Sequence, residues 1–359
     1  MSFDRIVKLL LIFVPIAIVA ELAHADPVLV FFLAALAVIP LADVIGEATE
    51  ELAVHTGPKI GGLLNATLGN AAELIITIFA LRAGLLELVR ASIAGSILGN
   101  LLLVLGLSIF LGGFKNGIQT FDRRTAGLNA TMLILAVVAL LVPSLFDAAL
   151  VENRAAELGL SEGTAVVMIV IYGLSVFYAF RQGDPITREP AAEETHKAKW
   201  SVRTALAVLA VATVGIVIMS EVLVGAVEHV TETLGLTEFF IGIIIIPLVG
   251  NVAEHLVAVQ VAIKNKMELS MAVSLGSSLQ VALFVAPVLV FISLLMGGET
   301  LLLVFNNFEL IALVAASLIA AFIALDGEST WLEGAMLLAV YIIIAIAFFY
   351  LPASTQIHP

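Results

Sequence analysis

Long apolar runs restrict what this chain can fold into more than any other feature of its sequence. A helix needs about 20 mostly apolar residues to cross a bilayer. Inside the bilayer no water can bond the backbone, so apolar runs of this length satisfy their N–H and C=O groups by forming helices. The runs divide near residues 6–23, 28–55, 59–82, 86–112, 125–146, 163–181, 202–233, 237–263, 268–296, 307–325 and 330–351. The sequence therefore predicts an all-α integral membrane protein with eleven transmembrane helices.

Composition agrees with this prediction and excludes several classes of function. Of 359 residues, 61% are hydrophobic and only 13% are charged, too few for a water-soluble domain of this length. The absence of cysteine excludes disulfides, thiolate metal sites and cysteine nucleophiles. The net charge of -13 argues against nucleic acid as a partner and suits cations, so we expect ions and the lipid bilayer as partners and no cofactor. The first apolar run resembles a signal peptide, but without a clear cleavage site we interpret it as a retained helix.

The sixteen Lys and Arg residues predict the orientation, because cytoplasmic loops carry an excess of positive charge. With a cytoplasmic N-terminus, thirteen of them fall inside, and only Arg82, Arg90 and Arg154 fall outside. We therefore expect a multi-pass protein of the cell membrane with its C-terminus outside. The hydrophilic linker from Gln182 to Trp200 then lies in the cytoplasm.

The chain contains an internal repeat at an offset of 181 residues. This offset aligns GNAAELIITI, which starts at Gly69, with GNVAEHLVAV, which starts at Gly250. Equivalent helices are five spans apart, and an odd number reverses their direction through the membrane. The two halves are therefore predicted to be inverted repeats, the build of many secondary transporters. The expected organisation is an extra helix at 1–27, a first repeat at 28–183, a linker at 184–201 and a second repeat at 202–359.

Two glutamates at repeat-related positions are the strongest functional candidates. Glu73 and Glu254 each follow an asparagine, Asn70 and Asn251, at helical spacing within an apolar run. An ionised carboxylate at mid-bilayer costs roughly 3 kcal/mol or more, which makes both residues functional candidates by default. The alternative is that each is protonated and joins helices by hydrogen bonds. Hard cations such as Ca2+ prefer oxygen ligands of this kind.

Other polar residues have more than one interpretation. The next spans carry Ser92, Ser96, Asn100, Ser274, Ser277 and Gln280, which are ligand candidates or, for the serines, packing residues. His255 adjoins Glu254 and is either a proton relay or a packed histidine. A second acidic set could attract cations or form solvated helix ends; it comprises Asp43, Glu47, Glu50, Glu221, Glu228 and Glu232. The linker acids Asp184, Glu189, Glu193 and Glu194 are interleaved with basic residues and are expected to be solvated.

The paired motifs GNAAELII and GNVAEHLVAV, followed by GSILGNLLLVLG and GSSLQVALFVAP, resemble the calcium/proton exchangers of the cation/calcium exchanger superfamily. The resemblance spans about residues 28–351. It implies that Glu73 and Glu254 carry the cation and the proton, and that further ligands surround them: Asn70, Asn251, Ser96, Asn100, Ser277 and Gln280. Gly99 departs from the family pattern, in which a small polar residue is more usual. The resemblance also implies a cleft that opens alternately to each side.

The two carboxylates suggest a mechanism without reference to the family. With a divalent ion bound, both can stay ionised; once the ion leaves, two like charges with little water favour uptake of a proton. Cation and proton therefore compete, and the predicted function is antiport of cytoplasmic Ca2+ against protons. A Na+-coupled exchanger or one for another divalent ion such as Mn2+ is the alternative. A channel would need a continuous pore, and an intramembrane enzyme lacks support because HExxH and GxSxG patterns are absent.

Overall fold

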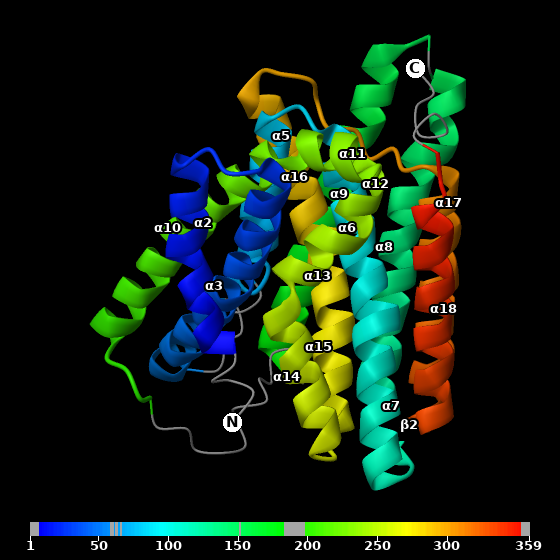
Figure 1. Ribbon diagram of the computed structural model, residues 1–359. Coiled ribbons are helices and arrows are strands. Elements are labelled where there is room, and N and C mark those ends of the chain that lie inside the picture. Colours follow the sequence, from blue (N-terminus) through cyan, green and yellow to red (C-terminus); the bar gives the residue numbers. More distant parts are fainter. Residues whose placement is uncertain are drawn as a thin grey trace. The chain divides into compact units, whose positions relative to one another are not determined.

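The computed structural model describes residues 7–57, 61, 64, 67–150, 152–182 and 198–352, and these residues are almost entirely helical (Figure 1). Two compact units are present. Unit 1 comprises Met1–Val89 and Ala191–Glu254, and unit 2 comprises Arg90–Pro190 and His255–Pro359. Each unit therefore combines segments from both halves of the sequence.

Unit 1 is built around the long helix α3 (Pro27–Thr56), which packs against α2 (Phe13–Leu22) and α10 (Val202–Gly225). Asp26 caps α3, because its side chain accepts hydrogen bonds from the Val28 and Leu29 amides. The remaining elements of the unit are η1 (Leu10–Ile12), α5 (Ala71–Arg82), α11 (Val227–Leu234), α12 (Glu238–Phe240), η5 (Ile241–Ile245) and α13 (Ile246–Gly250).

Unit 2 consists mainly of long helices (Figure 1). In chain order its elements are most of α6 (Leu86–Leu98), η2 (Gly99–Val104), α7 (Leu105–Asn116), β1 (Gln119–Thr120), α8 (Arg123–Leu150), α9 (Arg154–Gln182), most of α14 (Val252–Ile263), α15 (Met267–Gln280), η6 (Val281–Val285), α16 (Ala286–Met296), α17 (Asn307–Asp326), β2 (Glu328–Ser329) and α18 (Trp331–Phe349). α7 packs on α18, and α8 packs on α9, α15 and α17.

Capping residues start two of these helices where the chain re-enters the apolar region. Asn306 and Glu309 form a capping box at α17, and Thr330 and Glu333 form another at α18. Between them, α17 ends at Asp326 and is followed by Gly327, whose φ of 76° is readily accessible only to glycine. The two-residue strands β1 and β2 pair antiparallel, with Gln119 opposite Ser329.

The predicted all-α membrane fold is confirmed, but the count of eleven spans is not. Within the described residues, eight helices are long and apolar enough to cross a membrane, and a bent pair, Glu238–Gly250 with Glu254–Ile263, makes up to nine. The predicted first span is represented by the ten-residue helix α2, and the predicted third span at 59–82 includes residues outside those described. The boundaries of the other nine predicted runs agree with helices to within a few residues, apart from α9, which begins nine residues earlier.

Candidate cation-binding site

The two signature motifs have the same local structure. In each, an asparagine interrupts regular helix, with φ/ψ of -94°/20° at Asn70 and -111°/10° at Asn251. A helix follows at once, and Glu73 and Glu254 lie in the first turns of α5 and α14. The free amides and the dipole at a helix start favour negative charge, so both glutamates occupy places that stabilise a carboxylate.

Within unit 1, the first motif lies against the start of the second. Glu73 is fully buried, and a Cβ built on Gly250 would lie 3.7 Å from the Cβ of Glu73, which is van der Waals range. Asn70 and Asn251 are buried as well, whereas Glu254 is half-buried. The structure therefore brings together the first motif and the helix break of the second, from positions about 180 residues apart in the chain.

The other four predicted ligands lie in unit 2. Ser96, Asn100 and Ser277 are buried, and Gln280 is half-buried. The Asn100 side chain donates a hydrogen bond from Nδ2 to Ser277 Oγ at 3.1 Å, which links the two halves of the sequence. The eight candidates are thus divided four and four between the units.

Unit 2 also shows the repeat in its backbone. A π-helical segment follows α6, as η2 at Gly99–Val104, and another follows α15, as η6 at Val281–Val285. The offset of 181 residues superimposes these segments to within one residue. π-Bulges often occur at functional sites, because the extra residue alters which backbone carbonyls are available. Gly99, the departure from the family pattern, begins the first of them.

Some polar residues of the sequence pattern have local structural roles. Thr77, one turn after Glu73 in α5, donates a hydrogen bond from its hydroxyl to the Glu73 carbonyl at 2.8 Å. His255 is buried, and its Nε2 atom has no hydrogen-bond partner among the described residues. Ser92 and Ser274 are also buried, and among the residues that the structure describes neither hydroxyl has a hydrogen-bond partner.

The second acidic set is mostly exposed, which fits both solvated helix ends and attraction of cations; Asp43 is half-buried. Glu50, Glu221, Glu228 and Glu232 are exposed. Glu47 instead forms an ion pair with Lys8, with Oε2 and Nζ 2.8 Å apart, which ties the extra N-terminal helix to α3. No group of three or more acidic or histidine side chains is arranged to hold a metal within the described residues. The linker acids Asp184, Glu189, Glu193 and Glu194 lie outside them.

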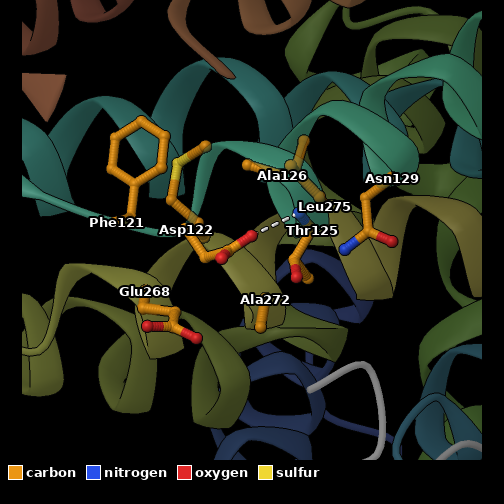
Figure 2. Close-up of a pocket in the computed structure, with 9 residues that line it drawn as sticks. Phe121, Asp122, Thr125, Ala126, Asn129, Glu268, Ala272 and Leu275 are labelled. Carbon is orange, nitrogen blue, oxygen red and sulfur yellow. Dashed lines mark hydrogen bonds between the residues drawn. The ribbon is translucent and has the colours of Figure 1, made fainter. Parts of the chain in front are cut away.

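A small pocket in unit 2 lies apart from these candidates, between the start of α8 and α15 (Figure 2). Its lining includes Phe121, Asp122, Asn129, Glu268 and Leu275, and none of the eight predicted ligands. Asp122 accepts a hydrogen bond from the Thr125 amide, drawn as a dashed line, and this bond holds the pKa of that carboxyl below its ordinary value. Asp122 is therefore engaged in capping α8.

Several buried polar residues were not among the sequence candidates, and Gln119 and Glu309 are two of them. Gln119 is almost fully buried in β1, and its amide donates to the end of α14. Glu309 is buried in α17, where the Asn-x-x-Glu spacing of its capping box was a signal that the sequence offered. Gln119 had no comparable local signal, because its partners lie more than 140 residues away.

Comparison with known proteins places the chain in a family. The family model for sodium/calcium exchanger protein matches residues 27–181 and 204–350. The chain is 44% identical to the Ca2+/H+ antiporter of Aphanothece halophytica, with 97% of each chain covered. It is 43% identical to the Ca2+/H+ antiporter ChaA of Bacillus subtilis, covering 94% of this chain and 97% of that one.

A solved structure agrees with these sequence matches. The structure of native YfkE resembles this chain with a TM-score of 0.85 and 41% identity, covering 96% of this chain and all of the other. The likeness therefore extends over both halves of the chain. The chain therefore belongs to the sodium/calcium exchanger protein family and, within it, to the group that contains the Ca2+/H+ antiporters.

Proposed function

We propose that this protein is a secondary active antiporter that exchanges cytoplasmic Ca2+ for protons by alternating access. The observation that carries the proposal is the pairing of Glu73 with the break at Gly250–Asn251, in a chain whose relatives are named Ca2+/H+ antiporters. These relatives are transporters, and the proposal includes no enzymatic activity and no cofactor. Ca2+ and protons are the transported substrates.

Glu73 and Glu254 are the proposed carriers of both ions. Each carboxylate begins a helix, where the exposed amides offset part of the cost of keeping a negative charge out of water. Two such charges in one unit can share a divalent ion, and Asn70 and Asn251 supply further amide or carbonyl oxygens. Ser96, Asn100, Ser277 and Gln280 remain predicted ligands of the same ion.

Coupling follows from the charge balance of this carboxylate pair. When Ca2+ leaves, repulsion between two ionised groups with little solvent favours protonation of at least one. The loaded states, with Ca2+ or with protons, are close to neutral, whereas the empty ionised state is costly to bury. A protein that changes access only in its loaded states exchanges one substrate for the other.

The alternative is coupling to Na+ or a preference for another divalent ion such as Mn2+. Proton coupling is favoured because each Asn-x-x-Glu motif supplies one carboxylate that can take up a proton. Transport measured in proteoliposomes separates the possibilities. With Na+ absent, an imposed pH step should drive 45Ca2+ uptake into vesicles whose interior is acidic, and collapse of the gradient should stop it. Uptake that needs Na+ and ignores the pH step would contradict the proposal.

The proposed orientation has the N-terminus and residues 187–197 in the cytoplasm and the C-terminus outside, as the charge distribution of the loops requires. Because the chain lacks cysteine, single cysteines at Thr187 and Gln356 can be labelled without background. An impermeant reagent on intact cells should label the second position alone. Labelling of both would rule out this topology.

A further inference from the structure

Two side chains hold the C-terminal end of α14, one from the last residue of α7 and one from strand β1. Gln119 donates from Nε2 to the Ala262 carbonyl at 2.9 Å and to Asn265 Oδ1 at 3.0 Å. Asn116 donates from Nδ2 to the Ile263 carbonyl at 3.2 Å and to that of Ala262 at 3.4 Å. We call Asn116 and Gln119 the α14 clamp. All of its contacts lie inside unit 2.

The clamp satisfies carbonyls that a helix end leaves without partners. The last carbonyls of α14 belong to residues 260–263, and backbone amides of the following turn reach only Gln260, Val261 and Ala262. Among the described hydrogen bonds, the Ile263 carbonyl receives its bond from Asn116 alone. The bond from Gln119 to the Ala262 carbonyl is buried, whereas the bond from Asn116 to the Ile263 carbonyl is exposed. Loss of a buried hydrogen bond costs about 1–3 kcal/mol, so the Gln119 bond favours one position for this end of α14.

Close packing against α7 also restricts the position of this end of α14. A Cβ on Gly112 would lie 3.0 Å from the Ala262 carbonyl oxygen and would collide with Gln119 Oε1. A Cβ on Gly113 would lie 2.7 Å from the Trp331 amide. α7 therefore passes directly against the end of α14 on one side and the start of α18 on the other, and Gln119 is only 1% exposed.

α14 is also the helix that carries a proposed ion ligand at its other end. Glu254 lies in its first turn, and the border between the two units falls between Glu254 and His255. Eight residues separate Glu254 from Ala262, which is about 12 Å along a helix axis. Glu254 and Ala262 lie in one continuous helix, so we expect a shift or rotation at Ala262 to alter the position of the carboxylate.

We infer that Asn116 and Gln119 are positioning residues for cation binding, which set the depth and rotation of Glu254 by anchoring the far end of α14. The inference rests on the proposed function, because it assumes that Glu254 binds Ca2+. Neither residue touches the ion. Partners hydrogen-bonded directly to a metal ligand typically alter metal affinity by about 10- to 100-fold when they are replaced, and we expect an anchor farther along the helix to act at the lower end of that range.

Gln119→Leu tests the inference, since it keeps approximate size and removes both hydrogen bonds. We expect the KM for Ca2+ in proton-driven uptake to rise about tenfold. The rise in Tm on adding Ca2+ should shrink correspondingly, because that rise reports affinity by mass action. Asn116→Ala leaves Gln119 in place and should give a smaller change in the same direction. It also serves as the test if Gln119→Leu fails to fold.

Ser175→Ala is the matched control. It removes a hydrogen bond to a helix carbonyl, that of Tyr172 in α9, elsewhere in unit 2. Its KM and its Ca2+-dependent rise in Tm should equal those of wild type. If the clamp variants lowered the Tm without Ca2+ but kept wild-type KM, the clamp would be a purely structural feature and the inference would be wrong. Failure of the proposed function is distinguishable, because wild-type protein would then show neither proton-driven uptake nor stabilisation by Ca2+.

Discussion

Glu73→Gln and Glu254→Gln should each abolish proton-driven Ca2+ transport while leaving the protein folded. Glutamine keeps the size and one acceptor oxygen of the side chain but removes the charge and the exchangeable proton. Loss of one partner from a buried ionic cluster costs about 3–5 kcal/mol, so Ca2+ affinity should fall at least about a hundredfold. Uptake of 45Ca2+ into proteoliposomes with an imposed pH step measures the effect.

Thermal unfolding separates loss of function from loss of fold in these variants. A neutral amide is cheaper to keep in the membrane than an ionised acid, so both variants should melt at least as high as wild type without Ca2+. Both should lose most of the stabilisation that Ca2+ gives by mass action, which is about 2.7 kcal/mol for wild type at a hundred times the Kd.

Glu299→Gln is the control, because it removes a carboxylate that lies outside the proposed cation site. Glu299 is exposed in the loop after α16, so its neutralisation should leave both transport and the effect of Ca2+ unchanged. Purified, folded Glu73→Gln or Glu254→Gln protein that exchanged Ca2+ for protons near the wild-type rate would refute the two-carboxylate mechanism.

Apparent Ca2+ affinity should fall steeply as the pH decreases, because protons and Ca2+ compete for the same carboxylates. Protonation of either glutamate removes a charged ligand, so affinity is highest where both are ionised and declines toward acid. In the range where one proton replaces the ion, linkage requires the apparent Kd to rise about tenfold per pH unit, and about a hundredfold for two protons.

Calcium titration of the Tm between pH 8 and pH 5 measures this competition without requiring transport. The double variant with both glutamates changed to glutamine should show no pH-dependent Ca2+ effect, which assigns the proton uptake to these two residues. Wild-type affinity that stayed constant down to about pH 5, close to the range where glutamate titrates, would mean that other groups carry the proton.

The sequence alone determined the membrane fold and the identity of the main candidates. Apolar runs of about 20 residues must be helices in lipid, because no other local structure satisfies the backbone there. The equivalence of Asn70 and Glu73 with Asn251 and Glu254 was visible because an internal repeat preserves residue types at a fixed offset. The same local structure at both motifs was therefore foreseeable, and the structure has it.

Contacts between distant segments were decided only by the tertiary structure. Helical periodicity indicates which residues share a face, but not which side chain that face meets. Thr77 shares a face with Glu73, yet its hydroxyl binds the helix backbone. Glu47 was expected to attract cations or to lie at a solvated helix end, and it is paired with Lys8. The partners of Gln119 lie more than 140 residues away in the chain, and no local pattern encodes such a pairing. The sequence thus determines which groups can bind a cation, whereas the packing of helices from both halves decides how those groups are held, because side-chain hydrogen bonds depend on distances that only the folded chain defines.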